Sequence, residues 1–431
     1  MVRLGGSGSE IDGLAGMGGW GGVYARHRLD LSWGTISYGV LACGWMWERE
    51  RLETEISGLC SLGDEGLVCL SVRSGWDLWL GAQGLQAGDE VLVSAVTHPD
   101  MVRIIRQHGL RAVPVDIDPE TLAPRTRMLE AALTPRTRVV LVAHLFGGRM
   151  DLGPVFRFAR ERGLLLVEDC AQAFQGPERM GDSDADVSMY SFGTLKTLTA
   201  LGGAVLRVRD KETLDRMRGI QASYPSQGRG AYLKKLVGVL GLVAVSRPRP
   251  YGLLSRACAR LGYDFDALVG GVVRGFPPRE PAAAFFRRLR HRPSAPLLAM
   301  LDRRLRTFDG KRLARRAEAG ERFARRLRVV DLHPGRRLLE RTHWLFPVIV
   351  ADPEALVADL RRQSLDAGRA TSSIAAVDAP SGRPSPAEAS LMMSGAVFLP
   401  TYPELPQQAF DVMAGIVNEY ADRGAAERVA M

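Results

Sequence analysis

Two side chains near the middle of the sequence, Asp169 and Lys196, place a carboxylate and an amine in an apolar setting. Asp169 ends the apolar run LLLVED (164–169), and Lys196 follows the run 187–192 in a glycine-bounded turn. Burial disfavours the ammonium form of a lysine, and the lowered pKa suits an amine that forms a Schiff base. Pyridoxal phosphate needs these two groups, the amine for its aldehyde carbon and the carboxylate for its pyridine nitrogen.

Each of the two groups also has a plain structural interpretation. Lys196 could be an ordinary surface lysine on a turn, and Asp169 could cap the segment that starts near Ala171. Ser191 favours the functional interpretation, because its hydroxyl lies five residues before the lysine at a predicted strand end, where it could reach a phosphate.

Two further segments place polar groups between a predicted strand and a predicted helix. Ser74, Gly75 and Trp76 form one such turn. Backbone N–H groups at a helix N-terminus bind phosphate without any particular side chain, although a structural turn would serve equally well here. His98 follows the next strand, where it could stack on a cofactor ring or cap the helix that begins at Pro99.

The elements that must position these residues alternate regularly from residue 67 to residue 208. The predicted strands are 67–72, 91–96, 112–117, 138–146, 164–169, 187–192 and 204–208. The predicted helices are 45–59, 76–85, 100–108, 127–133 and 155–162. Apolar strands alternating with amphipathic helices are typical of a parallel α/β sheet covered on both faces. Ligands of such sheets bind outside the carboxyl ends of the strands, where the candidate residues fall.

We predict four parts along the chain. They are a flexible glycine-rich leader (1–28), a large α/β domain (29–218), a helical and proline-rich insertion or arm (219–286), and a smaller C-terminal α+β domain (287–431). Within the last part, the sequence predicts a strand at 343–350 and helices at 352–364 and 407–420.

The formal net charge is +9, and arginines concentrate in the C-terminal half. The charge could attract nucleic acid, anionic lipid or a phosphorylated small molecule, but we favour a solvated helical face. No aromatic residues interleave with the arginines as a base-stacking platform requires, so we expect no nucleic-acid partner. The apolar run 236–245 is half of the roughly 20 residues that span a bilayer. Peripheral membrane contact through 232–250 is an alternative to the buried helix that we favour.

The five cysteines contain no CxxC pair, which indicates reduced thiols and a cytoplasmic location. The seven histidines show no paired metal-ligand spacing. The glycine-rich start lacks the apolar core of a signal peptide. We therefore expect neither a bound metal nor a secreted disulfide framework.

Taken together, the segments resemble the DegT/DnrJ/StrS family of pyridoxal-phosphate sugar aminotransferases, which have the aspartate aminotransferase fold (fold type I). The matching segments are GDEVLVSAVTHPDM, PVDIDPETL, LTPRTRVVLVAHLFG, GLLLVEDCAQAFQG, SMYSFGTLK, GGAVL and FLPTYPELP. They occur in the family's order, within residues 45–210 and 340–420.

The resemblance implies a role for each matching residue. It makes Lys196 the Schiff-base lysine, pairs Asp169 with the pyridine nitrogen, and places Gln172 near the ring hydroxyl. It places His98 where many relatives have an aromatic residue that stacks on the ring. The implied phosphate contacts are the side chains of Ser74 and Ser191 and the amides of Gly75 and Trp76. Trp76 stands where relatives usually have threonine.

The resemblance further implies an aminotransferase that moves an amino group from L-glutamate or L-glutamine to a keto sugar. A nucleotide-linked sugar is the expected acceptor, in the biosynthesis of amino sugars, surface polysaccharides or natural products. Lys196 would move the proton as general acid and base. Relatives of this kind are homodimers with their active sites at the subunit interface, so we expect a homodimer here.

Two alternatives remain open at this point. A pyridoxamine-dependent sugar dehydratase of the same family would carry histidine in place of Lys196. A non-catalytic relative could keep the fold and use its basic arm to dock on a membrane or a polymer. In that case the set formed by Lys196, Asp169 and Ser191 would serve no purpose.

Overall fold

A computed structural model describes residues 22–26, 28–263, 280–328, 333–369 and 374–430. Seven strands form one sheet in the order β1-β9-β8-β7-β5-β2-β4. The strands are β1 (Gly66–Cys69), β2 (Glu90–Ser94), β4 (Arg111–Val115), β5 (Thr137–Ala143), β7 (Leu165–Asp169), β8 (Val187–Ser191) and β9 (Ala204–Val208). Strand β9 runs opposite to the other six strands, which all run in one direction. The predicted, mainly parallel sheet is therefore confirmed.

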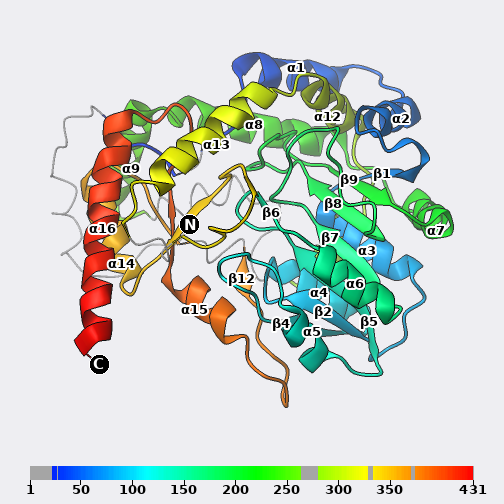
Figure 1. Cartoon of the computed structure of the whole chain (residues 1–431). Coiled ribbons are helices and arrows are strands. Elements are labelled where there is room, and N and C mark those ends of the chain that lie inside the picture. The colour runs from blue at the N-terminus through cyan, green and yellow to red at the C-terminus, as the bar shows by residue number, and fades with distance from the viewer. Residues whose placement is uncertain (1–21, 27, 264–279, 329–332, 370–373, 431) are drawn as a thin grey trace.

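Helices cover both faces of the sheet because alternate strand residues point to opposite sides. In β2, Val91 and Val93 join one core with α3 (Val72–Ala82), α4 (Pro99–Gln107) and α7 (Lys211–Ala222). Leu92 joins the opposite core with α5 (Thr126–Ala132) and α6 (Gly153–Glu161). Figure 1 shows this layered arrangement around the strands.

One predicted strand is longer than the observed one. Residues 138–146 were expected to be extended throughout, but β5 ends at Ala143. The chain then turns, and Phe146 adopts a positive φ of 59°. The apolar side chains of Leu145 and Phe146 are buried beside the turn, which explains why the sequence pattern continues past the strand.

A group of helices packs over the β8–β9 end of the sheet. It consists of α1 (Trp33–Gly44), α2 (Arg49–Leu59), α8 (Arg229–Val245) and α12 (Ala295–Arg306). Helix α1 was not predicted, because its apolar residues surround the helix and give no amphipathic pattern. Helix α12 was expected in the C-terminal domain, but it packs against α1, α2 and α8. We therefore propose that the boundary of the C-terminal domain lies near residue 310.

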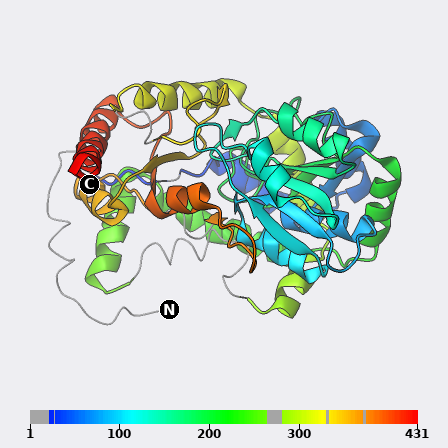
Figure 2. The same cartoon turned by 60° about the horizontal axis from the view of Figure 1, so that its bottom comes forward.

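The smaller domain is built on two antiparallel strands, β11 (Phe346–Ile349) and β13 (Ala396–Leu399). Helices α13 (Gly310–Ala324), α14 (Pro353–Arg362) and α16 (Gln407–Ala430) pack on this pair around Phe323 and Met413. Figures 1 and 2 place α14 and α16 at the end of the molecule opposite to the large sheet. The predicted strand and both predicted helices are present, and a further helix, α15 (Ala387–Gly395), was not expected.

The expected leader needs correction in its described part. The N–H of Tyr24 donates to the carbonyl of Ser364 and its own carbonyl accepts from Asp366, both at 2.9 Å. These bonds fix residues 22–26 to the smaller domain, while residues 1–21 and 27 lie outside the described residues.

The described part of segment 219–286 is mostly helical, with residues 223–228 outside the helices. It contains the end of α7, then α8, α9 (Pro248–Arg260) and most of α11 (Ala282–Leu289), and residues 264–279 lie outside the description. Within the described ranges, no helix combines the length and the apolarity needed to cross a membrane. In the apolar run, Leu236 is buried, whereas Val237 is 56% exposed.

Two short pairings return the smaller domain to the carboxyl edge of the large sheet. Strand β12 (Ala375–Ala376) pairs with β3 (Val96–Thr97), which follows β2. Strand β10 (Glu340–Arg341) pairs with β6 (Gly148–Arg149), which follows β5. Both pairings therefore bring residues of the smaller domain to the edge at which the candidate residues were predicted.

Candidate active site

Lys196 lies in the turn after β8 and contacts a side chain of the smaller domain. Its backbone N–H donates to the carbonyl of Gly193 at 3.1 Å. Its Nζ atom lies 4.7 Å from the centroid of the Trp344 ring, and the Trp344 N–H donates to the carbonyl of Leu195 at 2.8 Å. Trp344 was predicted to lie inside a strand. Strand β11 begins two residues later, and the Trp344 indole contacts the Lys196 turn.

The environment of Lys196 lowers the pKa of its side chain and so increases the unprotonated fraction. Burial lowers its pKa to about 8, with the Arg73 guanidinium acting in the same direction and the Asp169 carboxylate against it. Relative to an ordinary lysine, the unprotonated fraction at neutral pH rises by more than about 100-fold. Lys196 therefore has the protonation behaviour expected of a nucleophilic amine.

Asp169 ends β7, next to the strand that leads to Lys196. One carboxylate oxygen, Oδ1, accepts from the N–H of Ala171 at 2.9 Å, so the expected capping contact exists. The other oxygen accepts no hydrogen bond in the described part of the chain. Burial raises the pKa of Asp169, while the Ala171 bond and the charge of Lys196 oppose that rise. One oxygen is thus fixed and the other is available to a ligand.

The neighbouring carboxylate, Glu168, belongs to a different network. It accepts from His144 Nε2 at 2.8 Å, from Ser188 Oγ at 2.6 Å and from the N–H of Asp182 at 2.9 Å. Although burial opposes it, these partners hold the pKa of Glu168 well below its usual range. His144, Glu168 and Cys170 could hold a metal by proximity, but the carboxylate already has a full set of partners.

Two hydroxyl groups near Lys196 have no hydrogen-bond partner among the described residues. A Cβ atom added to Gly193 would lie 3.7 Å from Ser191 Oγ and 3.9 Å from Lys196 Cγ, so Ser191 and Lys196 flank one small space. Ser191 is partly exposed, whereas Thr194 Oγ1 is buried. Buried polar groups are nearly always paired, so the Thr194 hydroxyl fits an added acceptor such as a phosphate, which the Ser191 hydroxyl could also reach.

Of the two roles that the sequence left open for His98, the structure shows the capping role. His98 caps α4, because its Nδ1 atom accepts from the N–H of Asp100 at 3.1 Å. Burial lowers its pKa to about 4, and the charges of Arg73 and Lys196 contribute in the same direction. The imidazole is therefore neutral near pH 7 and lies within electrostatic range of Lys196. A neutral ring in this position fits stacking on an aromatic cofactor.

Gln172 supports the turn that follows β5. Its Oε1 atom accepts from the N–H of Phe146 at 2.8 Å. Its amide nitrogen makes no hydrogen bond within the described ranges, so this donor is available to a ligand.

The predicted phosphate contacts of Ser74 and Gly75 need correction. Helix α3 begins at Val72, and its cap is Ser71, whose Oγ accepts from the N–H of Ser74 at 3.2 Å. The N–H of Gly75 donates to the carbonyl of Ser71, and Ser74 Oγ donates to the carbonyl of Leu289 at 2.9 Å. Ser71 followed by Ser74 is itself a capping signal, and it indicated this earlier helix start.

Trp76 is likewise directed into the core. Its ring is fully buried and stacks on Trp79, with ring centroids 5.5 Å apart, and its N–H donates to the carbonyl of Met101 at 3.2 Å. We therefore leave Ser74, Gly75 and Trp76 out of the site.

A cation missed by the sequence analysis stands near this helix start. Arg73 bonds Asp100 at 2.7 Å, and its charge lowers the pKa of both Lys196 and His98. Burial lowers the pKa of Lys235 in α8 to about 8, and the charge of Arg73 acts in the same direction. The site is therefore electropositive on this side.

Part of the chain is similar in sequence to known proteins. Residues 47–241 match the model of the DegT/DnrJ/EryC1/StrS aminotransferase family. UDP-N-acetyl-3-dehydro-alpha-D-glucosamine 3-aminotransferase of Acidithiobacillus ferrooxidans is 33% identical over 178 residues, 40% of this chain and 48% of the relative. GDP-perosamine synthase of Caulobacter vibrioides is 28% identical over 215 residues, which are 46% of this chain and 58% of that relative. The chain thus aligns with about half the length of these curated relatives.

The likeness in structure extends over almost the whole chain. The aminotransferase TlmJ of Streptoalloteichus hindustanus has a TM-score of 0.67 and 22% identity, covering 93% of this chain and all of that one. This likeness confirms the predicted fold type I, with its parallel sheet and smaller C-terminal domain.

Proposed function

Because residues 47–241 match the model of the DegT/DnrJ/EryC1/StrS aminotransferase family, we propose that the whole chain is a pyridoxal-phosphate-dependent sugar aminotransferase of this family. The observation that carries the proposal is the pair formed by Lys196, with a pKa of about 8, and the buried carboxylate of Asp169. The names of the two curated relatives specify UDP- and GDP-linked sugars. We propose that the amino acceptor of this chain is likewise a nucleotide-linked keto sugar. The proposed amino donor is L-glutamate or L-glutamine.

The residues around Lys196 fit the proposed cofactor. The unbonded oxygen of Asp169 would accept from the pyridine N–H, and the amide nitrogen of Gln172 would donate to the ring hydroxyl. The unpaired hydroxyls of Ser191 and Thr194 would donate to the phosphate. When bound, pyridoxal phosphate supplies an electron sink for the carbanion that forms on the substrate.

Lys196 would carry the proton in both halves of the reaction. Its Nζ atom, unprotonated in an appreciable fraction at neutral pH, removes the proton from Cα of the amino-acid donor. In the second half, Lys196 delivers a proton to the sugar carbon that receives the amine, because the carbonyl carbon of a keto sugar carries no hydrogen. The Trp344 ring covers the ammonium form and keeps it close by a cation–π contact.

We also propose that the enzyme is a homodimer and that α1 contributes to its interface. Large apolar side chains are exposed on and after this helix: Trp33 (50%), Leu41 (74%), Trp45 (66%) and Met46 (81%). Soluble proteins seldom expose such a group unless a partner covers it. The start of α8 adjoins this surface, because Arg229 donates to the carbonyl of Trp45.

Covalent labelling tests the assignment of Lys196. Purified protein would be mixed with pyridoxal phosphate, reduced with borohydride, digested and analysed by mass spectrometry. We expect the label on Lys196, a visible absorption band before reduction, and loss of that band on adding L-glutamate. Lys196→Ala should remove both the label and the band. Folded protein without a label on Lys196 would contradict the proposal and favour a non-catalytic role.

A further inference from the structure

A pocket lies between Lys196 and the smaller domain. Four basic side chains line it: Arg26, Arg28, Lys196 and Arg316. Among the described residues that line this pocket, none is acidic. The remaining lining is apolar or carries hydroxyl groups, with Trp344 beside Lys196. A cavity of this composition fits a ligand that brings negative charge.

Two of the arginines already have acidic partners outside the lining. Arg26 lies 3.7 Å from Asp366, and Arg28 lies 3.6 Å from Glu404. Arg316 differs, because within the described ranges its guanidinium takes part in no ion pair or hydrogen bond. The second turn of α13 thus presents to the pocket a cation that has no ion pair among the described residues.

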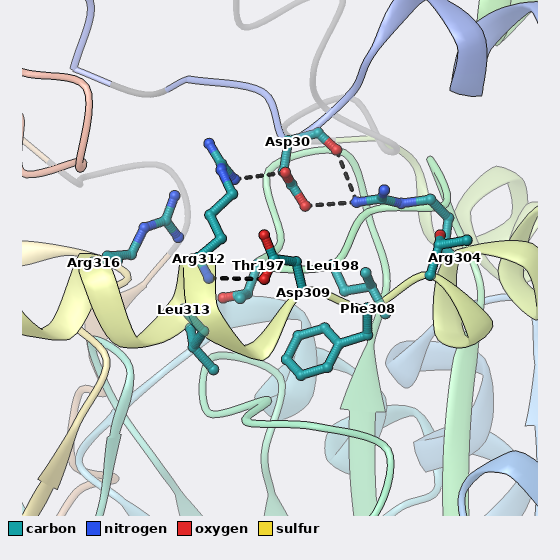
Figure 3. A pocket seen from close by; sticks show the side chains of 10 residues that line it. Asp30, Thr197, Leu198, Arg304, Phe308, Asp309, Arg312, Leu313 and Arg316 are labelled. Atoms are coloured by element: carbon teal, nitrogen blue, oxygen red, sulfur yellow. Dashed lines mark hydrogen bonds and ion pairs between the residues drawn. The ribbon is translucent and has the colours of Figure 1, made fainter.

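The two acids whose charges act on Arg316, Asp30 and Glu404, are paired with other arginines. Arg316 also lines an adjoining pocket that contains Asp30. The two carboxylate oxygens of Asp30 pair with Arg304 at 2.5 Å and Arg312 at 2.6 Å. Figure 3 shows Arg312 and Arg304 joined to Asp30 by dashed lines, whereas Arg316 stands beside them without one. Burial lowers the pKa of Arg316 and the charge of Arg312 adds to this effect, while the charges of Asp30 and Glu404 oppose it.

We propose that Arg316 binds an anionic group, a carboxylate or a phosphate, of the substrate that reacts at Lys196. A half-buried, unpaired guanidinium is costly, and a planar anion can satisfy it with two parallel hydrogen bonds. The inference rests on the proposed function and refines it, because the anion can come from the amino-acid donor or from the nucleotide of the acceptor. Both sources offer oxygens that match the guanidinium fork.

The test measures binding by calorimetry, without turnover, in Arg316→Gln and in a matched control, Arg315→Gln. Arg315 is the next residue in α13, its side chain is 57% exposed, and it lies 3.7 Å from Asp309. The probes are 2-oxoglutarate, which carries the carboxylates of the donor, and UDP, which carries phosphates. We expect Arg316→Gln to weaken one probe about 10- to 100-fold and Arg315→Gln to weaken neither.

The outcomes separate the sources and the two proposals. Weaker 2-oxoglutarate binding assigns the anion to the donor, and weaker UDP binding assigns it to the acceptor. Unchanged binding of both probes to folded Arg316→Gln would overturn the inference, even where Lys196 is labelled by the cofactor. Ligand-free Arg316→Gln should also be at least as stable to urea as the wild type, because it removes an unpaired cation. A clear loss of stability would indicate a structural role instead.

Discussion

The ammonium nitrogen of Lys196 lies 4.7 Å from the centroid of the Trp344 ring, and the indole N–H bonds the carbonyl of the preceding residue, Leu195. One side chain of the smaller domain therefore covers the amine and fixes the turn that carries it. The position of the smaller domain is thus coupled to the reactive group of the large domain.

This contact predicts a graded loss of cofactor affinity in Trp344 variants. Trp344→Phe keeps an aromatic face but loses the N–H donor, and Trp344→Leu loses both. We expect the dissociation constant for pyridoxal phosphate to rise about 5-fold in the first and about 20-fold in the second. Absorbance titration measures both values. Equal affinity of Trp344→Leu and the wild type would show that the contact has no role in holding the turn.

The pKa of Lys196 predicts how the labelling rate depends on pH. Only the unprotonated amine attacks the cofactor aldehyde, so the rate of labelling should rise with pH and level off above about pH 8. The Asp169 carboxylate raises the pKa of Lys196. Its removal in Asp169→Asn should therefore move the midpoint to lower pH. A midpoint near pH 10.5 in the wild type, or a shift to higher pH in the variant, would contradict this electrostatic account.

Most of the large domain could be predicted from the sequence, because each of its strands is marked by a pattern within a short segment of the chain. Buried parallel strands are continuous apolar runs, and each strand end is marked by a polar residue such as Asp169 or Ser191. This placed the acid, the hydroxyl and the lysine correctly relative to the sheet. Helix α1 was missed because exposed apolar residues such as Leu41 remove the amphipathic signal.

The rest of the site depends on contacts between distant parts of the chain. Trp344 and Arg316 are 148 and 120 residues beyond Lys196, and nothing in their own segments indicates that they reach it. The phosphate contact expected at Gly75 was wrong for a local reason, because the capping serine at position 71 starts the helix earlier. An isolated Ser-Gly could not distinguish these two helix starts.

The unpaired hydroxyl of Thr194 predicts opposite effects on stability and on cofactor binding. Thr194→Val removes a buried donor that lacks a partner, so the free energy of unfolding of the apo protein should stay equal or rise by up to about 1 kcal/mol. The same change should weaken pyridoxal phosphate about 10-fold if the hydroxyl holds the phosphate. Thr194→Ser is the control, and it should retain the affinity. Urea unfolding and absorbance titration give the two quantities, and unchanged affinity in Thr194→Val would remove this residue from the site.

The exposed apolar surface near α1 predicts the oligomeric state. Leu41→Glu places a charge in the proposed dimer interface and should convert a dimer into a monomer at micromolar concentration. Leu391, which is 67% exposed on α15, offers a matched control. Light scattering coupled to size exclusion measures the mass of both variants. A wild-type monomer, or a Leu41→Glu dimer, would exclude α1 from the interface.

Two adjacent carboxylates, Glu168 and Asp169, predict opposite responses of stability to substitution. Glu168 has a lowered pKa, so its contribution to stability is present above about pH 4.3 and is lost as the pH falls. Glu168→Gln should lower the free energy of unfolding at pH 7 by about 3 kcal/mol, because it leaves the cation of Arg149, 3.3 Å from Glu168, without its carboxylate.

Asp169 has a raised pKa, so its ionisation costs folding free energy. This cost develops as the pH rises from the ordinary pKa of an aspartate, about 3.9, to the raised pKa, and it stays constant at higher pH. Asp169→Asn should therefore be as stable as the wild type or more stable, although it should lose cofactor-dependent activity. Urea unfolding at pH 7 and pH 4 measures both variants, and the deficit of Glu168→Gln should shrink at the lower pH. A loss of stability in Asp169→Asn as large as that in Glu168→Gln would mean that both carboxylates support the fold, which would remove the physical basis for assigning Asp169 to the cofactor.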